Sequence, residues 1–155
     1  MIDIDDDMIS LDLPDQSQEE SIIKVIGVGG GGSNAVNHMF NQGIHGVEFV
    51  VCNTDIQALR QSRVKNRVQL GKELTEGRGA GCQPERGRLS AIESMDFIKT
   101  ILQRNTRMVF ITAGMGGGTG TGAAPEIAKQ ARELGILTIG IVTVPFSFEG
   151  KRKIE

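Results

Sequence analysis

Three glycine-rich segments restrict the fold of this 155-residue chain more than any other feature of its sequence. They are "GVGGGGSN" (27–34), "GRGAG" (77–81) and "GMGGGTGTG" (114–122), and each lies between a predicted strand and a predicted helix. Glycine accounts for 21 residues, but it shows no triplet period, which argues against a collagen-like chain. The clustering instead predicts loops whose backbone approaches another group closely.

The chain around these loops alternates between apolar runs and segments with helical spacing. Strands are predicted over 21–28, 46–53, 67–71, 107–113 and 136–144, and helices over 35–43, 54–62, 84–104 and 124–135. Several strands are apolar without alternation, as expected when both faces of a sheet are covered. The pattern predicts an α/β fold, a doubly wound and mostly parallel sheet with helices on both faces.

Two of the predicted helices carry more detailed expectations. Asn53 or Thr54 is predicted to cap the helix over 54–62. In the helix over 84–104, apolar residues recur at helical spacing and are assigned to the core. These residues are Leu89, Ile92, Met95, Ile98 and Leu102.

Charge divides the chain into two parts. Residues 1–20 hold eight of the 19 acidic residues and none of the 17 basic ones, so the remainder carries a net charge of +6. We therefore expect a disordered acidic leader over 1–20 and a nucleotide-binding part over 21–155. Two cysteines, Cys52 and Cys82, are expected to be free thiols in a reducing compartment. A secretory signal and an apolar run of membrane length are both lacking, which favours a cytoplasmic location without membrane insertion.

The position of the glycine segments indicates their chemistry. Ligands of open parallel sheets bind outside the carboxyl ends of the strands. There, glycine lets backbone N–H groups face a concavity, and the following helix adds partial positive charge. The hydroxyls of Thr119 and Thr121 can bond phosphate oxygens. Three such loops at one edge predict a site for a polyphosphate.

The first glycine segment alone leaves two nucleotide classes open. Gly27, Gly29 and Gly32 match G-x-G-x-x-G, the dinucleotide fingerprint of NAD-dependent oxidoreductases. That pattern calls for an acid at the end of the second strand, where this chain has Asn53, with Asp55 somewhat late. The segment "GGGTGTG" (116–122) favours another nucleotide, because a dinucleotide fold has no use for it. A Walker sequence is absent, which excludes a P-loop NTPase.

"GGGTGTG" (116–122) resembles the signature of the tubulin/FtsZ superfamily. Thr121 stands where tubulins carry Ser or Ala, and so favours the FtsZ family of bacterial cell-division GTPases. "NTDIQAL", "GRGAG", "PERGR" and "PFSFEGKRK" resemble further segments of that family in the same order, and the resemblance runs from Ile22 to the end of the chain.

The resemblance implies GTP or GDP, with Mg²⁺, at the sheet edge. It places five residues on the α/β-phosphate side: Gly30, Gly31, Gly32, Ser33 and Asn34. It places the signature loop against the phosphates: Gly116, Gly117, Gly118, Thr119, Gly120 and Thr121. It implies that the γ-phosphate is contacted by Gly79, Ala80 and Gly81.

Three further residues receive roles from the same resemblance. Asp55 is placed near the γ-phosphate and magnesium, although an acid in the first turn of a helix is an alternative interpretation. Glu149 is placed against the ribose. Lys153 stands where the family usually has Arg, which keeps the charge but loses the forked geometry. No catalytic residue is assigned, and His38 and His45 lie in no cluster of metal ligands.

The resemblance also implies a larger assembly. Members of the family form head-to-tail filaments of the division ring at mid-cell, with other division proteins as partners, and a loop of the next subunit completes hydrolysis. The sequence stops before that loop, so we expect a fragment of a longer protein. Two other interpretations are an NAD(P)-dependent oxidoreductase domain and a truncated module that caps filaments. Neither nucleic acid nor direct membrane insertion is expected.

Overall fold

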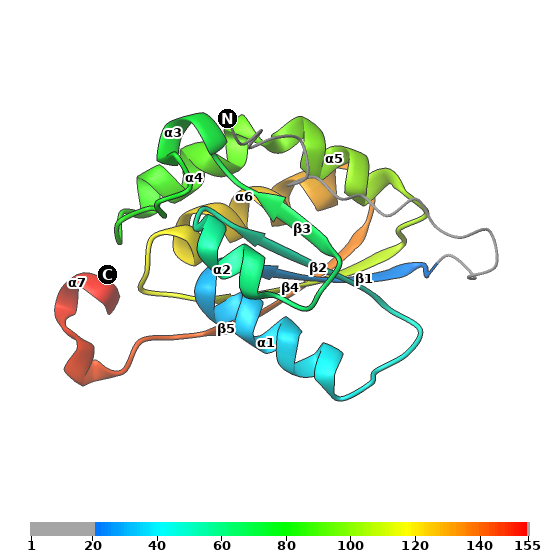
Figure 1. Cartoon of the computed structure of the whole chain (residues 1–155), viewed down its shortest axis with the longest axis horizontal. Helices are drawn as coiled ribbons and strands as arrows, with labels where there is room; N and C mark the ends of the chain where they lie inside the picture. The colour runs from blue at the N-terminus through cyan, green and yellow to red at the C-terminus, as the bar shows by residue number, and fades with distance from the viewer. Residues whose placement is uncertain (1–20, 155) are drawn as a thin grey trace, which may run out of the picture.

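The computed structural model describes residues 21–154, so the predicted leader over 1–20 lies outside the described residues. Five parallel strands form one sheet in the order β3-β2-β1-β4-β5 (Figure 1). Their bounds are β1 Ile23–Val28, β2 Glu48–Asn53, β3 Asn66–Gln69, β4 Met108–Gly114 and β5 Leu137–Thr143. The helices are α1 Gly29–Asn41, α2 Ile56–Gln61, α3 Lys72–Thr75, α4 Pro84–Glu93, α5 Met95–Gln103, α6 Thr119–Glu133 and α7 Lys151–Ile154, with a 3₁₀ turn, η1, at Ser147–Glu149.

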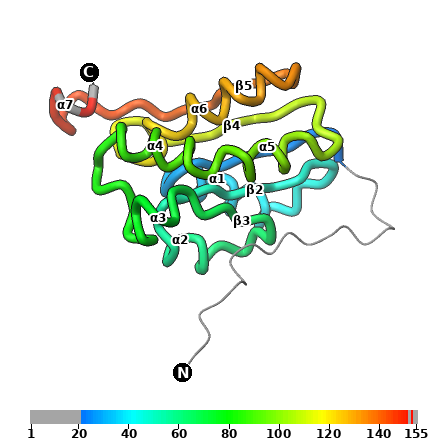
Figure 2. Tube along the Cα trace, turned by 90° about the horizontal axis from the view of Figure 1, so that it is seen from above, coloured from blue at the N-terminus to red at the C-terminus, as the bar shows by residue number. Residues whose placement is uncertain are grey.

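Helices cover both faces of the sheet, which confirms the predicted doubly wound fold (Figure 1); Figure 2 looks onto the face that α4 and α5 cover. On one face, α1 and α2 bury Val36 and Leu59 against Val25 and Val51 of the strands. On the other face, α4, α5 and α6 enclose a larger apolar cluster. Cys52 belongs to this second cluster, and burial raises the pKa of its thiol to about 12, so it remains protonated and unreactive.

Two helices begin earlier than the sequence predicts. The predicted loop over 29–34 is already helical, because α1 starts at Gly29. Likewise, α6 starts at Thr119 and not at residue 124. Close packing explains why glycine, a poor helix former, occupies these turns. A Cβ atom on Gly32 would lie 2.2 Å from the carbonyl oxygen of Thr112, so α1 approaches β4 as only glycine permits.

The predicted helix over 84–104 is two helices that meet at Ser94. The Ser94 hydroxyl accepts a hydrogen bond from the Gly71 N–H at 3.0 Å, which ties the break to the end of β3. The core prediction holds for Ile98 and Leu102 in α5 but is wrong for α4.

Leu89 and Ile92 of α4 are 41% and 46% exposed. The buried face of α4 is made of Gly87, Ser90 and Ala91. Small residues are needed there because α4 packs directly against α6: a Cβ atom on Gly122 would lie 1.9 Å from the Pro84 carbonyl oxygen.

Strand β5 lies at one edge of the sheet and is largely exposed along its length. Leu137, Ile141 and Val144 are 60%, 57% and 74% exposed. Among residues 21–154, no helix combines the length and the apolar character needed to cross a membrane.

Candidate functional site

The candidate site forms where the central strands end. Val28, the last residue of β1, pairs with Cys52 of β2 and with Ala113 of β4. The segments that follow these strands therefore emerge together at the carboxyl ends of the strands, on the left of Figure 1, where α7 also lies. This side of the sheet is called the edge below and is distinct from the edge strand β5. As the sequence predicts, this edge collects the glycine-rich segments.

The N-termini of α1 and α6 converge at this edge. A Cβ atom on Gly29 would lie 2.8 Å from the Gly120 nitrogen, and one on Gly31 would lie 3.2 Å from the Gly114 Cα. No side chain caps either helix, since the N-cap positions are Val28 and Gly118. Two sets of uncapped N–H donors therefore lie side by side, and their partial positive charges favour an anion.

The glycines of this edge divide into open and packed positions. A Cβ atom on Gly30 or Gly117 would meet no atom within 4 Å, and the same is true of Gly81. These positions leave backbone accessible to a ligand. They are the members of the predicted set whose surroundings fit a phosphate cradle most directly.

Five other predicted glycines are needed for packing between segments: Gly31, Gly32, Gly116, Gly118 and Gly120. A Cβ atom on Gly120 would lie 2.6 Å from the Gly114 carbonyl oxygen, and one on Gly118 would lie 2.8 Å from the Ala80 Cβ. Gly32 packs on β4 in the same way. These glycines shape the edge by allowing its backbone segments to touch.

Ser33 supplies a polar group that the protein itself leaves unpaired. Its side chain is buried, with 6% of the residue exposed, and its hydroxyl has no hydrogen-bond partner within the part of the chain that the structure describes. An unpaired buried hydroxyl is costly, so a ligand or water partner is expected at the start of α1. Asn34, next in the chain, is exposed.

The two threonines of the signature loop differ in their contacts. Thr121 accepts a hydrogen bond from the Gly116 N–H at 3.0 Å and so closes the loop onto α6. Thr119 instead pairs with the hydroxyl of Thr54, at 2.7 Å between the oxygens. The sequence proposed Thr54 only as a possible helix cap, and this contact was missed.

Asp55 is the residue that caps α2, in place of the predicted Asn53 or Thr54. Its Oδ1 accepts from the N–H groups of Gln57 and Ala58 at 2.8 and 3.2 Å. Asn53 instead accepts from the Thr54 N–H at 2.8 Å and so shapes the turn before the helix. Asp55 therefore lies at the N-cap and not in the first turn of α2, as the alternative interpretation had it, and the cap uses a single carboxylate oxygen.

The loop over 77–81 lies beside the Asp55 turn and the signature loop. The Gly79 N–H donates to the Thr54 carbonyl oxygen at 3.2 Å, and Asp55 and Arg78 form an isolated antiparallel bridge. Ala80 is buried, near Gly118. The structure therefore brings Gly79, Ala80 and Gly81 to the same edge as the signature loop.

The segment after β5 also approaches this loop. A Cβ atom on Gly116 would lie 2.5 Å from Pro145 Cγ and 3.4 Å from the Lys153 Cβ. Glu149 accepts a hydrogen bond from the Phe146 N–H at 3.1 Å and one from Lys153 Nζ at 3.4 Å. These two contacts, in that order, hold the pKa of Glu149 below its ordinary value.

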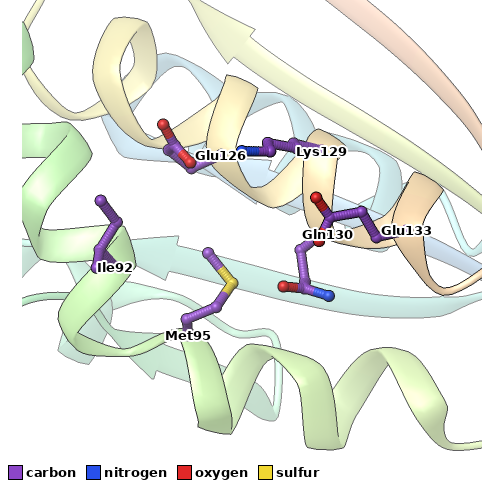
Figure 3. Close-up of a pocket in the computed structure, with 6 residues that line it drawn as sticks. All are labelled: Ile92, Met95, Glu126, Lys129, Gln130 and Glu133. Atoms are coloured by element: carbon purple, nitrogen blue, oxygen red, sulfur yellow. The ribbon is translucent and has the colours of Figure 1, made fainter.

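A second concavity, of about 140 Å³, lies away from this edge, between α4, α5 and α6. Ile92 and Met95 line it from one side, and Glu126 and Glu133 from α6, with Lys129 and Gln130 beside them (Figure 3). Its two carboxylates outnumber the single ammonium of Lys129, whereas the glycine-lined edge presents N–H donors. The sheet edge is therefore the better candidate for an anion site.

The chain is similar to proteins of one family. Residues 22–155 match the family described as "Tubulin/FtsZ family, GTPase domain". "Cell division protein FtsZ" of Aquifex aeolicus (strain VF5) is 61% identical over 133 residues, which cover 86% of this chain and 36% of that protein. The protein of the same name from Porphyromonas gingivalis is 62% identical over 134 residues, covering 86% of this chain and 29% of that protein.

Solved structures agree with the sequence matches. An empty FtsZ dimer from M. jannaschii superposes with a TM-score of 0.83 at 43% identity, over 88% of this chain and 40% of that one. A GTPγS-bound protofilament of CetZ2 from Haloferax volcanii gives a TM-score of 0.75 at 26% identity, over 84% of this chain and 42% of that one. The chain spans about a third of the length of the curated relatives it matches. Both its sequence and its fold show that the chain belongs to the tubulin/FtsZ family.

Proposed function

We propose that this chain is the GTP-binding part of an FtsZ-like cytoskeletal GTPase. The observation that carries the proposal is the convergence of two uncapped helix N-termini, α1 and α6, on open backbone at Gly30 and Gly117. Such a cradle suits the phosphates of a nucleotide. GTP is the nucleotide of choice because the chain belongs to a GTPase family and its relatives are named as cell division proteins.

Different residues at this edge would bind different parts of the nucleotide. The N–H groups at the start of α1, with the unpaired hydroxyl of Ser33, receive one part of the phosphate chain. Gly117 and Thr119 receive another from the signature loop. Glu149 and Lys153, which lie beyond Gly116, would close the site at the ribose.

Magnesium would accompany the nucleotide, and Asp55 is the described residue that fits it best. Carboxylate oxygens suit Mg²⁺, and the α2 cap engages only Oδ1 of this side chain. The ion would supply charge neutralisation for the phosphates. Asp55 would hold or orient it while remaining fixed by its helix.

The names of the relatives support a proposed function in the cell. Filaments of FtsZ-like subunits would assemble head to tail in the cytoplasm and form the ring at the division septum, with other division proteins as partners. A loop of the neighbouring subunit would complete the hydrolytic site. This chain would supply the nucleotide-binding face of that interface.

A competition titration tests the proposal. A fluorescent GTP analogue is bound to the chain with Mg²⁺ and then displaced by GTP, ATP or NAD. Displacement by GTP, with no effect of NAD, is expected, and displacement by NAD alone would overturn the proposal in favour of an oxidoreductase domain. Gly117→Ala should weaken binding, whereas Gly140→Ala is the matched control, because Gly140 is equally open but lies within β5.

A further inference from the structure

Thr54 occupies a junction between three segments of the candidate site. It follows β2 directly and is completely buried. Its carbonyl oxygen accepts from the Gly79 N–H at 3.2 Å and from the Thr75 hydroxyl at 3.3 Å. Its own hydroxyl reaches the Thr119 hydroxyl of the signature loop, with the oxygens 2.7 Å apart. One residue therefore joins the loop over 77–81 to the first turn of α6.

The burial of Thr54 decides the direction of its side-chain hydrogen bond. Either hydroxyl could donate from the distance alone. The Thr54 hydroxyl has no other partner among residues 21–154 and is shielded from water, so its proton would be left unpaired if Thr119 donated. A buried unpaired donor is costly. The arrangement that leaves no buried donor unpaired is therefore donation from the Thr54 hydroxyl to the Thr119 hydroxyl.

This direction has a consequence for the ligand. With its oxygen engaged by Thr54, the Thr119 hydroxyl is fixed in place and keeps its own proton for donation to an outside acceptor. Hydrogen bonds in such a chain strengthen one another, because each polarises the next. Thr119 is half-buried at the start of α6, where the helix N-terminus already favours an anion.

We infer that Thr54 is a positioning residue for the nucleotide: its buried hydroxyl orients the Thr119 hydroxyl to donate to a phosphate oxygen. The inference rests on the proposed nucleotide site. Thr54 itself does not touch the ligand and acts through Thr119. The same residue links the two loops, since its hydroxyl contacts Thr119 of the signature loop and its carbonyl oxygen accepts from Gly79 of the loop over 77–81.

Valine and serine variants of Thr54 test the inference in the full chain. Thr54→Val keeps the shape but removes the donor, and should weaken binding of the fluorescent GTP analogue roughly fivefold, the effect of one hydrogen bond. Thr54→Ser keeps the hydroxyl and should bind like the parent chain. Ser62→Ala removes a buried hydroxyl far from the edge, which donates to Asn37 at 2.7 Å, and should lower the melting temperature without changing affinity.

A double-mutant cycle separates positioning from general destabilisation. If Thr54 acts through Thr119, the variant Thr54→Val/Thr119→Val should bind no more weakly than Thr119→Val alone. Multiplying losses, or Thr54→Val binding like the parent chain, would overturn the inference while leaving the nucleotide site intact. A loss in Ser62→Ala equal to that in Thr54→Val would overturn it as well. Absence of binding by the parent chain would instead reject the proposed function, and the inference with it.

Discussion

The two ends of the sheet satisfy their polar groups in opposite ways. At the carboxyl end, β1 and β4 run into helices whose N-termini have no side-chain cap, and Ser33 keeps an unpaired hydroxyl. At the amino end, Lys24 of β1 is 1% exposed but forms an ion pair with Glu48, its register partner on β2. Glu48 also accepts from the Asn66 amide of β3 at 3.0 Å.

This contrast separates the end of the sheet whose polar groups are available to a ligand from the end whose polar groups stabilise the fold. At the amino end the polar groups pair with one another: the buried Lys24 ammonium pairs with Glu48, and Glu48 also accepts from the Asn66 amide. At the carboxyl end the N–H donors and the Ser33 hydroxyl would find their acceptors on the proposed ligand. Changes at the amino end should therefore lower stability without weakening binding, while changes at open positions of the carboxyl end should weaken binding without lowering stability.

The largest effect is expected from Gly32→Ala, which tests a packed position of the carboxyl end. The new Cβ would lie 2.2 Å from the Thr112 carbonyl oxygen, so α1 would have to move away from β4. We expect a loss of more than about 3 kcal/mol in the free energy of unfolding, at the upper end for overpacking. Denaturant unfolding measures it. An unchanged midpoint would show that α1 does not approach β4 this closely.

A smaller loss of stability is expected from Glu48→Gln at the amino end. The change leaves the Lys24 ammonium buried without a counter-charge, which costs about 2–3 kcal/mol, because Glu48 is itself partly exposed. Denaturant unfolding again measures the loss, and nucleotide affinity should not change. The control is Lys24→Met/Glu48→Gln, which removes both charges and should recover part of the stability. Weaker nucleotide binding by Glu48→Gln in the folded chain would contradict the separation of the two ends.

Gly30→Ala should lower the affinity for nucleotide without lowering stability, which is the reverse of the effect expected for Glu48→Gln. Gly30 lies in the first turn of α1 with open space where a Cβ would be, so alanine should keep or raise stability, by up to about 1 kcal/mol. The same methyl group would hold a phosphate away from the helix N-terminus, and affinity should fall on the order of tenfold. Thermal unfolding and the competition titration measure the two effects. Equal affinity in Gly30→Ala would place the ligand elsewhere on the edge.

Much of the fold could be predicted because its signals are local. The apolar runs that become β1, β2 and β4 are short and bounded by turn residues, and their alternation with helices dictates a parallel sheet. The start of α1 could not be predicted, since glycine disfavours helices and only contact with β4 explains Gly32 there. The break at Ser94 depends on Gly71, 23 residues away in the chain.

The sequence was enough to predict that the segments of the candidate site lie together, but not which of its glycines are open and which are packed. Sequence spacing places the glycine segments at one edge, yet the difference between Gly30 and Gly32 depends on which backbone lies opposite each. Thr54 shows the same limit. Its position before a helix suggests a cap, whereas its actual partner, Thr119, is 65 residues away in the chain.

The smallest effect concerns the segment after β5, where Glu149 caps η1. The Phe146 N–H, and then Lys153, hold the pKa of Glu149 below the value of about 4.3 that is usual for the side chain. Since this folded-state pKa is the lower one, ionised Glu149 contributes stability above the unfolded-chain value that is lost as pH falls through the folded-state value. The turn at 146–149 should therefore loosen only in acid below the usual range.

The chemical shift of the Phe146 amide, followed by NMR against pH, measures this titration directly. Lys153→Met removes the weaker of the two causes, so the midpoint should rise only part of the way toward the usual value. If Glu149 of the parent chain already titrates with the usual pKa, the Phe146 contact does not form, and another contact must order Glu149. Saturating GTP distinguishes these cases: if Glu149 approaches the ribose from a preformed turn, the amide shift should respond to nucleotide already at neutral pH, where the carboxylate is fully ionised.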